Sequence, residues 1–448
     1  MNTEHIKKIG FGRTLYQMTW PMLFGVLALM SYQLVDAAWI ALLGVDPLAA
    51  LGFTLPVQQL IIGFQVGLGI ATTAIISRTL GAGNPEKAQQ QGRLILITGL
   101  SLLALLMLFL WLLRPLILNF LGADAELRPL IDRYWAPWLL SAWLGAGVYL
   151  GYSQHRAQGD TKFPGLMMLV VSLLNLVLDP LFIFTFGWGL PGAAWATVVA
   201  FAFGGLMTYP RIFKKGWISP NLQGLAIIQE LRALFGTALP AMLSQLMPAF
   251  SAILATSLVA GFGTVAVAAW GLGTRLEFFS IVVVLALTMS LPPILGRFAG
   301  AGDWDSVERL LKLAVGFVIV WQLGIALVWM LVSQPLVNLI TEEAAVSELV
   351  QEYLFKLPIS YAALGVCMLM VSANNAVGMP LRGLMTSLVR LFACYLPCLW
   401  LGAQLAGISG LFTGALIGNF LAGTLAWLMY RQGLNQLRQQ RLGELRQQ

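Results

Sequence analysis

The sequence predicts an all-α integral membrane protein with twelve transmembrane helices in two six-helix lobes. Hydrophobic residues make up 58% of the 448 residues and charged residues only 10%, whereas a soluble domain carries about 25% charged residues. Apolar runs long enough to cross a bilayer recur through the whole chain, and the two halves of the chain repeat each other. This pattern excludes a soluble globular protein, a disordered chain and an extracellular disulfide scaffold.

Twelve apolar runs supply the predicted helices. A helix needs roughly 20 apolar residues to cross about 30 Å of hydrocarbon. Several runs are much longer than that, which predicts tilted or kinked helices. The first run follows polar residues, with nothing that resembles a signal cleavage site. In chain order the runs are 14–43, 48–78, 93–119, 134–156, 164–186, 190–212, 233–262, 266–296, 309–338, 350–378, 381–404 and 407–430.

Lysine and arginine residues set the expected orientation. If the N-terminus is cytoplasmic, most of them fall in the inner segments, and the outer loops hold only Arg114, Arg128 and Arg133. An excess of basic residues marks the cytoplasmic side of a membrane. We therefore expect a multi-pass protein of the bacterial cytoplasmic (inner) membrane with both termini in the cytoplasm. The net charge of +7 then marks a membrane face rather than a nucleic-acid site.

An internal repeat divides the chain. A shift of 219 residues aligns Pro21 with Pro240 and Arg78 with Arg297, together with the Gly-Ala-Gly triplets that start at 81 and 300. Each half has an even number of helices, so both repeats have the same orientation about an axis along the membrane normal. The predicted parts are an N-terminal lobe at 1–212, a cytoplasmic inter-lobe linker at 213–231, a C-terminal lobe at 232–431 and a basic cytoplasmic tail at 432–448.

A small polar set occurs in the first half alone. Asp36 lies in the first apolar run, Asn175 and Asp179 in the fifth and Thr197 in the sixth, and none recurs at the equivalent position of the second half. A carboxylate at a helix centre costs about 2.5–3.5 kcal/mol on insertion scales. Asn175 and Asp179 are four residues apart and share one helix face. These residues are candidates for proton exchange, while a structural hydrogen-bonding role for each acid stays open.

Two further features of the apolar runs have alternative interpretations. Pro21 precedes Asp36 by about four helical turns and permits a bend, but Pro240 holds the same place in the second half, so the bend could be simple architecture. In the second half, Arg275 and Glu277 lie two residues apart and therefore point in different directions. Functional and structural roles stay open for both.

Metal and redox chemistry find no support in the sequence. The two histidines are far apart, and the three cysteines lie in apolar runs without metal-ligand spacing. We expect no metal, no cofactor and no enzymatic activity. The cysteines, which we interpret as packing residues, are Cys367, Cys394 and Cys398.

Three motifs resemble those of the multidrug and toxic compound extrusion (MATE) family. The first run contains LVDAAWIALLG, the turn after the fourth contains HRAQGDTKFP, and the fifth contains NLVLDP. The resemblance covers nearly all twelve helices. It implies an antiporter that expels amphipathic, often cationic, compounds by alternating access, and we expect it to act as a monomer.

Within that family, the sequence resembles the proton-coupled DinF branch. The resemblance implies a cation-coupling network in the first lobe and a helix-1 bend at Pro21. The sodium-coupled NorM branch has a glutamate on helix 7, and the corresponding stretch here, Pro240 to Pro248, has no acid. Proton coupling is therefore favoured, with sodium still open. The network residues are Asp36, Asp179, Asn175, Thr197 and Tyr134.

Substrate contacts are expected from aromatic, methionine, amide and charged side chains. Ordinary helix packing is the competing interpretation for most of them. The candidates are Tyr32, Gln33, Gln59, Phe64, Arg275, Glu277 and Met289.

Three other functions remain as rivals. A lipid-linked oligosaccharide flippase of the same superfamily needs a strongly basic cavity, for which only Arg275 and Arg390 are available. An intramembrane aspartyl protease would carry a glycine before its catalytic acids, whereas Asp36 follows valine and Asp179 follows leucine. A passive channel would show a symmetric ring of filter groups, and the acids here lie in one half only.

Overall fold

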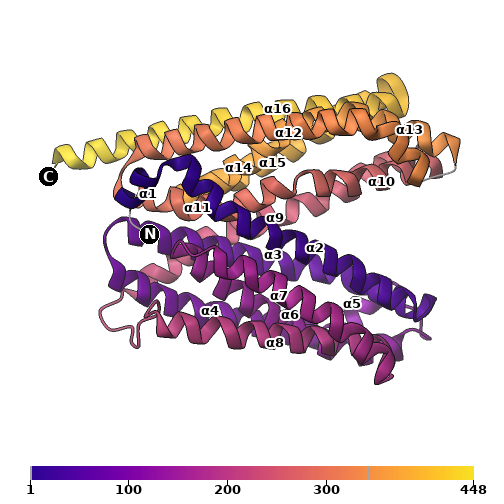
Figure 1. Ribbon diagram of the computed structural model, residues 1–448, viewed down its shortest axis with the longest axis horizontal. Coiled ribbons are helices and arrows are strands. Elements are labelled where there is room, and N and C mark those ends of the chain that lie inside the picture. The colour runs from indigo at the N-terminus through magenta and orange to yellow at the C-terminus, as the bar shows by residue number, and fades with distance from the viewer. Residues whose placement is uncertain (1–2, 341–342, 448) are drawn as a thin grey trace. The chain divides into compact units, whose positions relative to one another are not determined.

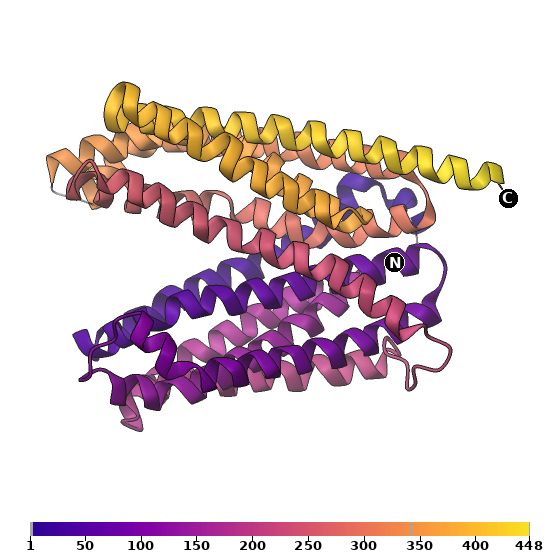
Figure 2. The ribbon, with the colours of Figure 1, turned by 180° about the vertical axis from the view of Figure 1, so that it is seen from behind.

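The computed structural model describes residues 3–340 and 343–447, and the side chains of 3–337 and 343–440. Contacts between residues divide the chain into two compact units. Unit 1 comprises Met1–Ile9 and Arg13–Met242, and unit 2 comprises Gly10–Gly12 and Leu243–Gln448. Every regular element in the described residues is helical, as the ribbons show (Figures 1 and 2).

Unit 1 is a bundle of long helices. In Figure 1, α3, α4, α6, α7 and α8 run alongside one another; α6 packs against α3, α4 and α8, and α7 packs against α8. Its elements are α1 (Thr3–Ile9), α2 (Phe11–Ala41), α3 (Val45–Gly81), α4 (Pro85–Leu112), α5 (Arg114–Phe120), α6 (Arg128–Ala157), α7 (Lys162–Pro180), the π-helical segment η1 (Leu181–Thr185), α8 (Gly189–Lys214) and the first part of α9 (Ile227–Ala260).

Unit 2 is also built of long helices, which short 3₁₀ and π-helical segments interrupt. Its elements are the rest of α9, α10 (Thr264–Ser280), α11 (Val282–Ala301), α12 (Trp304–Ile340), α13 (Ala344–Lys356), the 3₁₀ turn η2 (Leu357–Ser360), α14 (Tyr361–Val377), α15 (Pro380–Leu388), the π-helical segment η3 (Val389–Tyr395) and α16 (Leu396–Gln447).

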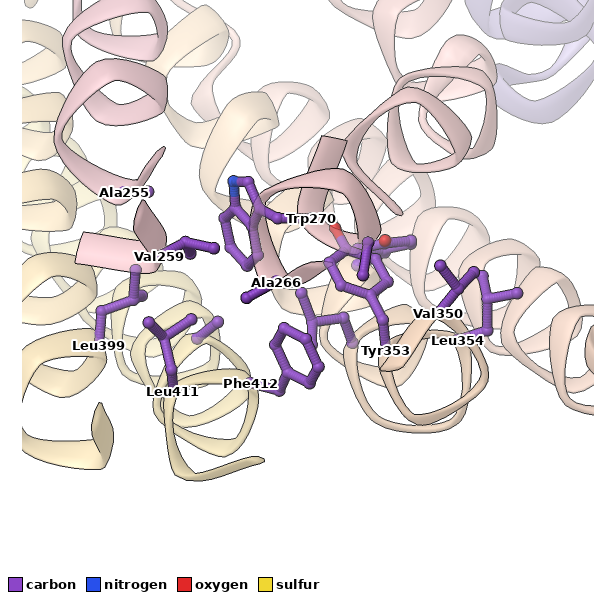
Figure 3. Packing of buried hydrophobic residues seen from close by; sticks show 14 of the residues in the cluster. Ala255, Val259, Ala266, Trp270, Val350, Tyr353, Leu354, Leu399, Leu411 and Phe412 are labelled. Carbon is purple, nitrogen blue, oxygen red and sulfur yellow. The ribbon is translucent and has the colours of Figure 1, made fainter. Parts of the chain in front are cut away.

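Aromatic side chains hold the core of unit 2 together. The rings of Trp270, Tyr353 and Phe412, from α10, α13 and α16, lie with centroids 5.5–6.2 Å apart. Figure 3 shows them surrounded by aliphatic side chains, among them Val259 of α9 and Leu411 of α16. Aromatic pairs at such distances add about 0.5–1.5 kcal/mol each beyond the area that they bury.

Paired glycines give both halves the same turns. Gly44 and Gly263, 219 residues apart, precede α3 and α10 with φ of 116° and 95°. Gly83 and Gly302, at the same spacing, have φ of 80° and 76°. Residues other than glycine rarely adopt such positive φ angles. The repeat therefore keeps glycine where the chain reverses between helices.

The last helix folds back on itself. Ala406 and Gly407 leave helical geometry, with φ of −144° and 60°, so α16 consists of two arms. A Cβ atom added to Gly402 would lie 2.1 Å from the carbonyl oxygen of Gly410, and one added to Gly414 would lie 2.1 Å from that of Cys398. Only glycine allows the backbones of the two arms to approach this closely.

The predicted fold class is confirmed. Ten helices have the length and composition to cross a membrane, judged on the described residues. The long helix α6 (Arg128–Ala157) falls outside that set because tryptophan, tyrosine, glycine and proline residues lower the mean hydropathy of its middle. With α6 included and the two arms of α16 taken separately, the twelve predicted spanning segments are present.

The contacts place the boundary between the units later than the repeat does. The connection between α8 and α9 covers residues 215–226, inside the predicted linker at 213–231. The start of α9 packs with unit 1, because Leu234, Ala238 and Met242 join the cluster around Leu68. The predicted tail at 432–448 continues α16 as helix to Gln447, and Gln448 lies outside the described residues.

Candidate functional site

Two glycines bring α2 and α7 into backbone contact. A Cβ atom added to Gly165 of α7 would lie 2.2 Å from the carbonyl oxygen of Pro21, and one added to Gly25 of α2 would lie 3.0 Å from that of Gly165. Pro21 stands inside α2, where it removes a backbone hydrogen bond. The backbones of α2 and α7 therefore meet at the residue where α2 can bend most easily.

Asp36 and Asp179, further along the same two helices, lie close together. Their carboxyl groups interact with each other. The hydroxyl groups of Tyr32 and Tyr134 lie within the electrostatic range of both acids. The structure thus brings together residues of α2, α6 and α7 that are widely separated in the sequence.

Asn175 connects this pair to α8. Its Nδ2 donates a hydrogen bond of 3.1 Å to Thr197 Oγ1, which in turn donates to the carbonyl oxygen of Ala193 at 3.0 Å. Asn175 lies one helical turn before Asp179 on the same face of α7. The structure therefore places all five residues of the predicted network in one neighbourhood.

Several oxygen atoms of the cluster are buried without a hydrogen-bond donor. Among the described residues, Asp36 Oδ1, both carboxyl oxygens of Asp179 and Asn175 Oδ1 accept no hydrogen bond of normal geometry. Within the described residues, no lysine, arginine or histidine forms an ion pair with either acid. A buried carboxylate without a partner is costly, so this cluster favours binding of a proton or a small cation.

Proline also reshapes α7 next to Asp179. Pro180 follows directly, and the chain then forms the π-helical segment η1 (Leu181–Thr185). Proline lacks the N–H that a regular helix uses, and π-helical turns are frequent at functional sites. A Cβ atom added to Gly192 of α8 would lie 2.7 Å from the carbonyl oxygen of Phe182, so α8 packs tightly on this segment. We did not predict this break in α7. The sequence does indicate it, because proline directly follows Asp179.

Large aromatic side chains cover the cluster on the α6 side. The ring centroid of Trp138 lies 6.3 Å from that of Tyr134 and 5.3 Å from that of Trp135. These rings belong to one buried group with Ile40 of α2 and Leu190 of α8. Such a wall keeps the local dielectric low, which strengthens the interaction between the two acids.

Unit 2 has a polar group of a different kind. Glu277 on α10 accepts a hydrogen bond of 3.0 Å from the hydroxyl of Tyr353 on α13. Arg390 of η3 and Tyr361 of α14 also interact with its carboxylate. Arg275 is exposed, which agrees with the different directions expected for residues two apart.

The turn between α6 and α7 contains a cluster of charged side chains around Asp160. From the sequence, this residue was named only as part of the HRAQGDTKFP motif. Asp160 Oδ2 lies 3.3 Å from His155 Nδ1, 3.1 Å from Lys215 Nζ and 3.8 Å from Arg211. Asp160 Oδ1 accepts a hydrogen bond from the backbone N–H of Phe163. Burial would raise the pKa of Asp160, but the hydrogen bonds from His155, Phe163 and Lys215 outweigh it and hold that pKa well below its usual range.

Comparison with known proteins agrees with the two-fold pattern of the chain. The MatE family model matches residues 21–181 and again residues 240–401, so the two matches start at Pro21 and Pro240. Together they cover more than half of the chain. The chain belongs to the MATE family.

Similar known proteins cover almost the whole chain. A crystal structure of the Vibrio cholerae MATE transporter VcmN in a bent form is 53% identical, with a TM-score of 0.93 over 95% of this chain and 98% of that one. A FAD transporter of Shewanella oneidensis is 31% identical over 93% of this chain and 94% of its own length. The multidrug export protein MepA of Staphylococcus aureus is 25% identical over 91% of both.

The remaining predicted substrate contacts of this MATE chain are scattered. Tyr32 joins the acidic cluster, whereas Gln33 and Gln59 are exposed on α2 and α3. Phe64 is partly buried against the core of unit 1, and Met289 is partly buried in unit 2. Within the described residues, no three His, Cys, Asp or Glu side chains are arranged to hold a metal ion.

Proposed function

We propose that this MATE chain is a secondary active multidrug exporter that exchanges protons for amphipathic, often cationic, organic compounds. The observation that carries the proposal is the pair of acids Asp36 and Asp179 in unit 1, three of whose four carboxyl oxygens are buried and accept no hydrogen bond from the described residues. An intramembrane acid pair is costly to keep and is typical of proton pathways in transporters.

Proton binding would act through the contacts of α2. A proton on Asp36 or Asp179 removes one negative charge and turns an acceptor into a donor. The neutral pair then holds different hydrogen bonds with the neighbouring Tyr134. Since α2 contacts α7 through Pro21 and Gly165, repacking of α2 would begin at that point. Outward release of substrate and inward release of the proton complete the exchange.

The oxygen groups of the cluster also suit sodium. Carboxylate, amide and hydroxyl oxygens are ligands for hard cations, and Asp36, Asp179, Asn175 and Thr197 supply all three kinds. We favour the proton, as in the DinF branch, because the stretch of α9 from Pro240 to Pro248 lacks the glutamate of the sodium-coupled NorM branch.

Transport in proteoliposomes with separate gradients tests this function. Purified protein is reconstituted, and export of a fluorescent cation such as ethidium is followed with either a pH gradient or a sodium gradient imposed. We expect export driven by the pH gradient at equal sodium, loss of that export in Asp36→Asn, and normal export in the matched variant Asp46→Asn, which removes an exposed acid at the start of α3. Export that follows sodium at equal pH would reject proton coupling.

A flavin dinucleotide is the second candidate substrate. The 31% identity with a FAD transporter over 93% of this chain supports it. The same vesicles, loaded with FAD in place of a cationic dye, decide between the two. Export of FAD without export of ethidium would replace the multidrug proposal and leave the coupling site to be tested with FAD.

A further inference from the structure

A small cavity in unit 2 lies between the start of α12 and the far arm of α16. Both views of the ribbon show these helices side by side (Figures 1 and 2). The cavity has a volume of about 160 Å³, which is below the roughly 300–1,000 Å³ of drug-sized sites. It is lined mainly by polar and aromatic side chains, namely Glu308, Trp427, Tyr430, Arg431, Asn435 and Arg438.

The lining offers hydrogen-bond donors that have no acceptor. Tyr430 is only 1% exposed, and its hydroxyl has no partner among the described residues. Arg438 uses one terminal nitrogen for Asp305 and Glu308, both at 3.1 Å, while its buried Nε has no acceptor. Arg431 is exposed at the mouth of the lining, and in the described part of the chain its guanidinium forms no ion pair. Buried donors without acceptors are costly, so the cavity suits a ligand that only accepts hydrogen bonds.

The acidic residue of the lining does not oppose such a ligand. Both oxygens of Glu308 are already engaged, Oε1 with Lys312 at 2.8 Å and Oε2 with Arg438 at 3.1 Å. Lys312 and Arg438 together offset the charges of Glu308 and Asp305, which leaves Arg431 as the uncompensated charge. The cavity therefore presents a positive, donor-rich surface of the kind that binds phosphate.

The position of the cavity indicates where the phosphate comes from. Trp427 and Tyr430 lie at the end of the last apolar run, and tryptophan and tyrosine gather at the level of lipid headgroups. The basic residues of the last helix follow directly. By the distribution of basic residues this end faces the cytoplasm, where anionic lipids attract such segments.

We propose that this cavity binds the phosphate group of an anionic phospholipid headgroup and thereby fixes the far arm of α16 to α12. The site is separate from the acidic cluster of unit 1, so the proposal does not depend on which ion drives transport.

Lipid retention and thermal unfolding of the purified full chain test the site. The protein is incubated with phosphatidylglycerol or phosphatidylcholine, and bound lipid is counted by native mass spectrometry. We expect phosphatidylglycerol to be retained and to raise the unfolding midpoint. Arg431→Gln and Tyr430→Phe should each weaken retention about tenfold, the effect of losing one charge-assisted hydrogen bond. Arg309→Gln, the same change on an exposed arginine of α12 outside the cavity, should behave like the unchanged protein.

The remaining outcomes are equally decisive. Equal retention of phosphatidylglycerol by the unchanged protein, Arg431→Gln and Tyr430→Phe would overturn the proposal, as would equal retention of phosphatidylcholine. A parallel sample receives inorganic phosphate without lipid. Stabilisation there that depends on Arg431, with no lipid retained, would keep the anion site but reject the lipid as its occupant.

Discussion

The carboxyl groups of Asp36 on α2 and Asp179 on α7 interact with each other inside unit 1, and three of their four oxygens accept no hydrogen bond from the described residues. Two negative charges this close in a low dielectric repel strongly. The pair is therefore expected to hold one proton or cation between the two groups rather than to act as two separate acids.

Double substitution tests whether the pair is one unit. We expect Asp36→Asn and Asp179→Asn each to reduce gradient-driven export to a small but measurable residual rate, and the double variant to be no slower than either single one, because residues that act together are not additive. Export rates in proteoliposomes at matched protein content measure this. Rates that fall independently, with the double variant equal to the product of the two single effects, would contradict a shared site.

Thr197→Val tests the support that α8 gives to the cluster. The change keeps the shape of the side chain but removes the acceptor of the 3.1 Å hydrogen bond from Asn175. A hydrogen bond of this kind contributes about 0.5–1.5 kcal/mol, so folding should persist while the pH dependence of export shifts. Thr424→Val, at an exposed threonine of α16, is the control, and an unchanged pH profile in Thr197→Val would argue against any role for α8.

Gly165→Ala tests the contact of α7 with the bend of α2. The added methyl group would lie 2.2 Å from the carbonyl oxygen of Pro21, so the helices must separate. Overpacking of this kind costs about 1–3 kcal/mol. We expect a lower unfolding temperature and slower export. The control is Gly205→Ala on α8, where the nearest atom would lie 3.8 Å away; an equal loss in both variants would mean that any alanine in these helices is harmful.

Asp160→Asn tests the ion cluster at the turn between α6 and α7. The folded protein holds the pKa of Asp160 below its usual value, which is about 3.9 in an unfolded chain. The carboxylate therefore stabilises the fold at pH values above about 4, and this contribution is lost as the pH falls further. The unfolding temperature of the variant should lie below that of the unchanged protein at pH 7, and the difference should shrink below about pH 4. A difference that stays constant with pH would reject the charge-based explanation.

The sequence was sufficient for the fold and for most members of the acidic cluster. Asp36, Asn175 and Asp179 stand out because polar groups in apolar runs are rare, and the repeat shows that the second half does not share them. Their gathering in space follows from helix packing that the sequence does not specify, although the motifs of the MATE family predicted it.

Details that depend on helix rotation and close contact were not predictable in the same way. Tyr32 was expected among the substrate contacts, and its place beside the two acids was not anticipated. Nothing in the sequence marks Gly165 as important, because its role depends on the backbone contact with Pro21 in the folded protein. The bond between Glu277 and Tyr353 joins α10 to α13, and no periodicity in either helix indicates that pairing.

Substrate-driven proton movement is the most direct test of the central claim, because coupling between two ligands is reciprocal. Vesicles that contain a pH-sensitive dye are exposed to a substrate gradient with no pH or sodium gradient at the start. We predict that the unchanged protein moves protons against the substrate flow, that Asp46→Asn does so equally, and that Asp36→Asn does not. Substrate flow without proton movement in the unchanged protein, or normal proton movement in Asp36→Asn, would contradict the assignment of the acid pair as the coupling site.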